Sequence, residues 1–193
     1  MITDAIRLVL DALFHIFILA VLVRFWMQAF RAPTRNPIAQ FSMALTDFAV
    51  KPLRRVIPGL LNLDWASLVV AWVAELVLQV LLVLVAGAPL TGEMLPVLLF
   101  LALVKLIRLS IYVFMGAVIL QAVLSWVAQN HPMEPFFNAL TRPFLQPFRR
   151  AIPPIGGVDI TPVLVLIAFQ LVLMLPVAWL EATTIRMLTR ALL

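Results

Sequence analysis

The sequence predicts an all-α membrane protein built from two tandem copies of one unit, each a helix, an amphipathic connector and a second helix. Three observations predict this fold class. The 193 residues are 64% hydrophobic and 12% charged, whereas soluble domains are about 45–50% apolar and about 25% charged. Four apolar stretches are long enough to span a bilayer. The chain also matches itself at an offset of 95 residues.

The four apolar stretches are expected to form the spanning helices. They cover residues 12–30, 66–86, 94–128 and 163–180. The third has 35 residues, and as a helix of about 52 Å it would exceed a hydrocarbon core of about 30 Å. We therefore expect it to protrude, break or divide near Lys105 and Arg108. The span would then be 109–126, with 94–108 at or outside the interface.

The self-match indicates a duplicated unit. Segment 37–64 is identical to segment 132–159 at eleven of 28 positions. Proline, paired arginine and aspartate match in register, which chance rarely produces in an apolar sequence. Upstream, Trp26 aligns with Trp126 at an offset of 100, so the first copy carries five extra residues. A self-match of this extent is strong evidence for two structural repeats.

The repeats set the expected domain organisation and orientation. The expected parts are a first repeat at 1–88 with its connector at 31–64, a second repeat at 94–182 with its connector at 129–162, and a short C-terminal tail at 183–193. Because each copy has an even number of spans, both insert in the same orientation, as parallel repeats. The connectors hold most of the Lys and Arg, so they are expected to face the cytoplasm.

Each connector has apolar residues at steps of three and four, which predicts a short amphipathic helix in the membrane interface. These residues are Ile38, Phe41, Leu45 and Phe48 in the first connector, and Met133, Phe136 or Phe137, Leu140 and Phe144 in the second. Asn36-Pro37 and His131-Pro132 are expected to start the two helices. Pro52 and Pro147 are expected to end them. A glycine-containing turn follows, Gly156-Gly157 in the second copy.

Paired arginines close each connector. Arg54-Arg55 and Arg149-Arg150 are followed, nine to ten residues later, by Asp64 and Asp159. One interpretation is a structural clasp, in which each pair fixes orientation and binds its aspartate. The other is contact with lipid phosphates or with an acidic segment of a partner. The equal separation in both copies favours the clasp.

Glu75 lies near the middle of the second span, and its counterpart at an offset of 95 is Gln170. An ionisable group inside a bilayer is costly unless it is paired or hydrated. Candidate partners are His15 and Lys105, with Gln79 one turn along the helix. Glu75 is therefore either a paired structural group or part of an ion or proton path. No metal site is expected, since the chain has no Cys and two His.

The string ALTRPFLQPFRRAIPPIGGVDITP, residues 139–162, resembles the signature of the YggT (YlmG-like) family of small bacterial and plastid membrane proteins. The two-copy plan is similar to the duplicated form of that family. The first copy differs from this family signature at Asp47-Phe48, at 60–62 and at Ala66-Ser67. One copy is therefore expected to carry the functional surface. The resemblance implies a role in cell division, nucleoid distribution, membrane-complex assembly or osmotic and ion homeostasis, without catalytic activity.

The sequence contains no glycine-rich phosphate loop, nucleophile elbow or metalloprotease helix, so neither an enzyme activity nor a cofactor is expected. The leading hypothesis is a scaffold or assembly factor of the bacterial cytoplasmic membrane. Its connectors would contact anionic phospholipids and a membrane-protein partner or a second copy. The alternative is a small ion channel or transporter component. Direct nucleic-acid binding is not expected, because the basic residues adjoin apolar segments.

Overall fold

The computed structural model describes residues 1–59, 63–127, 131–152 and 159–191. The helices are α1 (Ile2–Ala29), α2 (Pro37–Arg54), α3 (Trp65–Val85), α4 (Met94–Val127), α5 (Glu134–Ala151), α6 (Thr161–Val172), the π-helical turn η1 (Leu173–Val177) and α7 (Ala178–Ala191). The all-helical fold expected from the sequence is confirmed. The expected turns at 60–62 and at Gly156-Gly157 lie outside the described residues.

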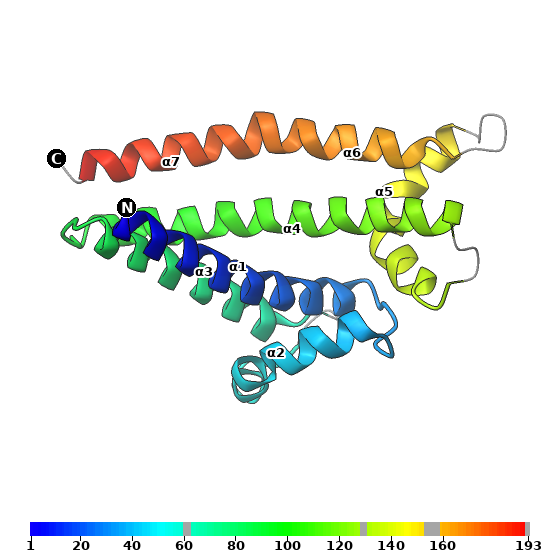
Figure 1. The fold of residues 1–193 in the computed structure, drawn as a ribbon, viewed down its shortest axis with the longest axis horizontal. Helices are drawn as coiled ribbons and strands as arrows, with labels where there is room; N and C mark the ends of the chain where they lie inside the picture. Colours follow the sequence, from blue (N-terminus) through cyan, green and yellow to red (C-terminus); the bar gives the residue numbers. More distant parts are fainter. Residues whose placement is uncertain (60–62, 128–130, 153–158, 192–193) are drawn as a thin grey trace.

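Four helical stretches among the described residues are long and apolar enough to cross a membrane. They are Ile2–Ala29, Trp65–Val85, Met94–Ser125 and Thr161–Arg190. Both termini and the α3–α4 loop lie at one end of the bundle, here called the terminal end (Figure 1). Both α1 and α4 run from there toward the opposite, connector end, and α3 and α6–α7 return (Figure 1). The two copies therefore run in the same direction.

The third apolar stretch neither breaks nor divides, because α4 is one continuous helix. Lys105 Nζ lies 4.0 Å from Glu75 Oε1, in the middle of α3. Lys105 therefore lies beside the middle of α3, and the expected break or division near Lys105 and Arg108 is wrong. The position of 94–108 at or outside the interface stays a prediction. The physical reason is pairing: Lys105 meets Glu75, and Arg108 meets Glu181 of α7. Cations with such partners can stay inside the bundle.

Helix starts follow the sequence signals more closely in the first copy than in the second. α2 begins at Pro37, and Asn36 is its side-chain N-cap, as expected. α5 begins at Glu134, two residues later than the expected start at His131-Pro132. Pro135 occupies the first turn of α5, where a missing N–H donor leaves no intrahelical bond unmade.

The prolines expected to end the connector helices lie inside them. α2 continues past Pro52 to Arg54, and α5 continues past Pro147 to Ala151. Each proline lies close to the helix C-terminus, where a missing N–H removes one hydrogen bond without interrupting a long helix. The expected stops are therefore two and four residues too early.

The last span is longer than the sequence suggests. The helix runs from α6 through η1 into α7, so 183–191 is helical and does not form a separate tail. Pro176 lies inside η1. Proline lacks an N–H donor and its ring crowds the preceding turn, and a widened π turn accommodates both effects within a continuous helix.

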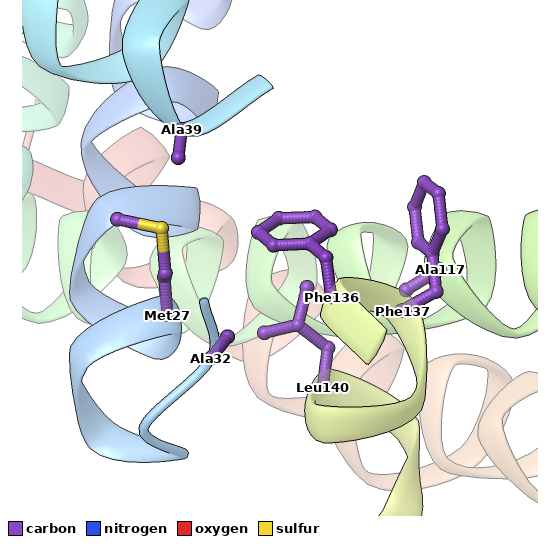
Figure 2. Close-up of a cluster of buried hydrophobic side chains, with 7 residues drawn as sticks. All are labelled: Met27, Ala32, Ala39, Ala117, Phe136, Phe137 and Leu140. Atoms are coloured by element: carbon purple, nitrogen blue, oxygen red, sulfur yellow. The ribbon is translucent and has the colours of Figure 1, made fainter. Parts of the chain in front are cut away.

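The two copies meet in a hydrophobic cluster at the connector end (Figure 2). It contains Met27, Ala32 and Ala39 of the first copy, and Ala117, Phe136, Phe137 and Leu140 of the second. Phe136 and Leu140 extend from α5 toward the residues of the first copy (Figure 2). Phe136 is 2% exposed, whereas its repeat counterpart Phe41 is 59% exposed. The apolar face of α5 thus packs on the bundle, while that of α2 stays open.

This difference gives a matched test of the contact between the copies. Phe136→Ala is expected to lower the stability of the purified protein by roughly 3–5 kcal/mol, as for other buried aromatic truncations. Phe41→Ala removes the same atoms from an exposed position and should change stability by less than about 0.5 kcal/mol. Thermal unfolding in one detergent measures both. Equal losses in the two variants would contradict the described packing.

Candidate functional site

The first clasp joins the end of α2 to the start of α3. Arg54 Nε lies 3.1 and 3.2 Å from the two carboxylate oxygens of Asp64. Arg54 Nη2 also donates to Asp64, and to Gln28 Oε1 at 2.9 Å. Ser67 Oγ donates to the same carboxylate. Asp64 is only 2% exposed, so protein donors replace water around its charge.

The first clasp stays ionised across the physiological range. Burial raises the pKa of Asp64, but the hydrogen bonds from Arg54 and Ser67 and the charge of Arg54 outweigh it, and the pKa lies below its ordinary value. The hydrogen bond to Asp64 raises the pKa of Arg54, against the effect of burial. Each partner therefore favours the charged form of the other.

The second clasp joins α5 to α6 and is more open to solvent. Arg149 Nε donates to Asp159 Oδ2 at 2.9 Å. The other oxygen of Asp159 accepts from the backbone N–H of Thr161 at 2.9 Å and from Thr161 Oγ1 at 2.6 Å. Asp159 thus also caps the first turn of α6. Burial raises the pKa of Asp159, but the bonds from Thr161 and Arg149 lower it further than burial raises it.

Each arginine pair contains one paired and one free member. Arg54 and Arg149 bind the aspartates. Arg55 and Arg150 are exposed, and neither has an ion pair or a hydrogen bond with the residues that the structure describes. The two interpretations of the arginines therefore apply to different side chains: the first of each pair has the clasp geometry, and the second is available to an external anion.

Arg24 makes a contact that the sequence analysis missed. It is buried in α1, and its Nη1 donates to Asp47 Oδ1 at 2.8 Å and to Thr46 Oγ1 at 2.9 Å. Lys51 Nζ lies 2.7 Å from Asp47 Oδ2. The bond from Lys51 lowers the pKa of Asp47, burial opposes this and Arg24 adds to the lowering. The available signal was an arginine inside an apolar stretch, which requires a partner of opposite charge.

The second copy replaces this ion pair by a neutral bond. Thr141, the repeat counterpart of Thr46, donates to Gln121 Oε1 of α4. The Phe137 carbonyl oxygen, one turn earlier in α5, lies 2.9 Å from the same hydroxyl and shares its single hydrogen. Both connectors are thus attached to their preceding span through the same threonine position, with a charged partner in the first copy and an amide in the second.

Glu75 is fully buried in α3. Gln79 Nε2 donates to Glu75 Oε1 at 2.6 Å, and Lys105 Nζ lies 4.0 Å from the same oxygen. Oε2 has no hydrogen-bond partner within the described part of the chain. His15, the other candidate partner, donates through Nδ1 to the Asp11 carbonyl oxygen at 2.7 Å. Of the two cationic candidates, the ion pair that the structure forms is therefore with Lys105.

A cavity of about 350 Å³, lined by both apolar and polar side chains, lies at the terminal end, between α1, α3, α4 and α7. Its polar lining residues are Arg7, Asp11, Gln79, Lys105 and Glu181. Because Gln79 and Lys105 also contact Glu75, the cavity ends beside the buried carboxylate. Gln170, the repeat counterpart of Glu75, is exposed on α6. Among the described residues, no group of three or more His, Asp or Glu is placed to hold a metal ion.

These features define the class of protein: an all-helical integral membrane protein of two parallel repeats, whose connectors are clasped to the spans by ion pairs. The chain belongs to the CCB3/YggT family, whose family model matches residues 3–85 and 100–180. The two matched segments correspond to the two copies. The family resemblance predicted from the sequence is confirmed.

Several bacterial relatives cover most of the chain. A protein of Vibrio alginolyticus is 35% identical over 171 residues, which cover 86% of this chain and 90% of that protein. A protein of Pseudomonas aeruginosa is 36% identical over 178 residues, covering 91% and 90%. The protein YggT of Escherichia coli is 29% identical over 181 residues, covering 93% of each. No solved structure matches the chain.

The two clasps are expected to differ in strength. Asp64→Asn leaves Arg54 without its buried acceptor, and because Arg54 is partly exposed the loss should be about 1–3 kcal/mol. Asp159→Asn affects a solvent-exposed pair and should cost about 0–1 kcal/mol. Thermal unfolding in detergent measures both effects. In a double-mutant cycle with Arg54→Gln, purely additive losses would show that Arg54 and Asp64 do not interact.

The pH dependence of the first clasp has a definite sign. Folding lowers the pKa of Asp64, so its stabilisation is present above the ordinary pKa of aspartate and is lost as the pH falls through the lowered value. The difference in free energy of unfolding between the unmodified protein and Asp64→Asn should therefore decrease as the pH is lowered from about 5 to about 2. A constant gap over that range would contradict the assignment.

Proposed function

We propose that this chain is a non-enzymatic scaffold or assembly factor of the bacterial cytoplasmic membrane, which presents two basic connectors to the cytoplasm. One observation carries the proposal: in each copy the clasp holds one arginine and leaves the next, Arg55 or Arg150, exposed and without an ion pair among the described residues. A guanidinium fixed at a clasped helix end is preorganised for an acidic segment of a membrane-protein partner, or of a second copy.

The character of α2 supports an interfacial position for the connectors. Phe41 and Phe48 are exposed apolar side chains of α2, and Lys51 of the same helix and Arg55, its C-cap residue, are exposed cations. An amphipathic helix with these two faces lies in the headgroup region and is attracted to anionic lipids. The excess of Lys and Arg in both connectors favours the cytoplasmic side.

Crosslinking of the full-length protein in native membranes, followed by identification of the crosslinked proteins, tests this function. A hydrogen bond to a charged group contributes about 1.5–3 kcal/mol, so Arg55→Gln/Arg150→Gln should reduce partner capture by about tenfold or more. Its matched control is Arg186→Gln/Arg190→Gln, which removes the same charge at the terminal end. Folding should be unaffected, because none of the four altered arginines forms an ion pair with the residues that the structure describes. Equal capture by both variants would refute the proposal.

A second candidate function, a small ion channel or transporter component, rests on the terminal-end cavity whose lining includes Gln79 and Lys105, the partners of Glu75. The carboxylate lies in the middle of α3, and its Oε2 has no partner among the described residues. An ionisable group at that depth, reached from one membrane face, is a typical position for a proton or cation relay. The residue occurs in the first copy alone, since Gln170 takes its place in the second.

Ion flux into proteoliposomes tests the second candidate. If Glu75 relays protons or monovalent cations, the protein should increase flux above that of lipid alone, and Glu75→Gln should abolish the increase. Gln170→Leu, at the counterpart position, should leave flux unchanged. Flux equal to that of empty liposomes, or insensitive to Glu75→Gln, would remove this candidate and leave Glu75 as a structural partner of Lys105.

A further inference from the structure

An apolar pocket of about 590 Å³ lies in the first copy, between α1, α2 and α3. Every residue that lines it is apolar, among them Phe14 and Phe17 of α1, Ala49 of α2, and Val70 and Ala74 of α3. Its volume falls within the range of about 300–1,000 Å³ that is typical of small-molecule sites. No polar residue lines the pocket, so its chemistry suits a hydrocarbon.

The second copy fills the corresponding space with its own side chains. At the repeat offset of 95, Ala49 and Ala74 correspond to Phe144 and Phe169. The rings of Phe144 and Phe169 pack with their centroids 5.1 Å apart, and Phe114 packs on Phe144 at 4.5 Å. Phe114 is the counterpart of Phe14, which lines the pocket. The pocket therefore exists because two alanines stand where the other copy has two phenylalanines.

The pocket lies on the hydrocarbon side of α2. Polar residues of α2 recur at steps of seven, four and three, which places them on one face of the helix. They are Gln40, Asp47, Lys51 and Arg54. Ala49 is two residues from both Asp47 and Lys51, and it therefore points about 160° away from each of them. Asp47 and Arg54 are held by ion pairs with Arg24 and Asp64. The pocket is lined instead by apolar residues of α1 and α3, both of which are long and apolar enough to span a membrane, so it faces the acyl chains.

We propose that this pocket binds one acyl chain of an anionic phospholipid, whose headgroup lies against the C-terminal end of α2. Arg55 follows Phe48 by seven residues, so the two lie on the same side of α2, two turns apart. Phe48 lines the pocket, and Arg55 is an exposed cation without an ion pair among the described residues. The chain and the phosphate of one lipid would thus be bound by neighbouring parts of one helix.

This inference goes beyond the proposed scaffold function, because it requires no protein partner. Lipid binding would make the first copy the lipid-holding repeat, while the second copy is closed by its own aromatic rings. The pocket variants below leave Arg55 and Arg150 in place. Failure of lipid binding and failure of partner capture are therefore separate results.

Photocrosslinking tests the proposal on the full-length protein in lipid nanodiscs. The probe is phosphatidylglycerol with a diazirine in one acyl chain, and the labelled peptides are mapped by mass spectrometry. Label is expected on the segments of α1 and α3 that line the pocket. Ala49→Phe/Ala74→Phe copies the residues of the second repeat and should reduce that label by about tenfold, or about 1.4 kcal/mol. Ala182→Phe, at an exposed alanine of α7, should leave it unchanged.

Three further variants extend the test, and they keep it decisive if the double phenylalanine variant fails to fold. Ala74→Leu fills part of the pocket and should reduce the label severalfold. Phe144→Ala/Phe169→Ala opens the second copy and should create new label there. Arg55→Gln should reduce labelling by phosphatidylglycerol to that of a phosphatidylcholine probe with the same chains. Label that persists in Ala74→Leu and in the double variant, or a pocket crosslinked to protein instead of lipid, would overturn the proposal.

Discussion

Hydrocarbon cannot solvate an ion, so each charge inside this bundle must meet a partner supplied by the protein. The described structure meets this constraint with ion pairs that join separate helices. They are Arg24–Asp47, Lys105–Glu75 and Arg108–Glu181 within the bundle, and Arg54–Asp64 and Arg149–Asp159 at the clasps. The pairs of α4 explain how a helix of 34 residues remains unbroken. Those at the connectors determine where each interfacial helix returns to a span.

The two copies share the order of helix, connector and helix, but they differ in how each connector packs. The second copy uses its connector to hold the bundle together, with Phe136 buried against the first copy. The first copy leaves the corresponding Phe41 exposed and holds its connector by the buried Arg24. Its polar Glu75 and its open apolar pocket have no equivalents among the described residues of the second copy, where Gln170 and packed phenylalanines occupy those positions. The exposed Phe41 and Phe48 of the first connector can therefore contact lipid.

The sequence predicted local and periodic features well, because they depend on residues close together in the chain. The spans follow from hydrophobic length, and the Arg54–Asp64 and Arg149–Asp159 contacts were anticipated from a spacing repeated in both copies. The Arg24–Asp47 pair was not anticipated, because it has no counterpart in the second copy. The continuity of α4 depends on carboxylates from α3 and α7, which only tertiary packing brings near it. Likewise, α2 and α5 have apolar residues at similar spacing. The sequence therefore could not predict that the apolar face of α5 is the one covered by tertiary packing.

The central claim is that the two copies lie side by side in one orientation, with both connectors at the same membrane face. Thiol labelling tests it directly, since the chain contains no cysteine. Single cysteines would be placed at Gly59, which follows α2, at Ala151, the last residue of α5, and at Gly92 in the α3–α4 loop. With an impermeant maleimide on intact cells, we expect Gly92→Cys to react and both connector positions to react only after lysis. Labelling of one connector position but not the other would contradict the parallel arrangement, and labelling of both with protection of Gly92→Cys would reverse the orientation.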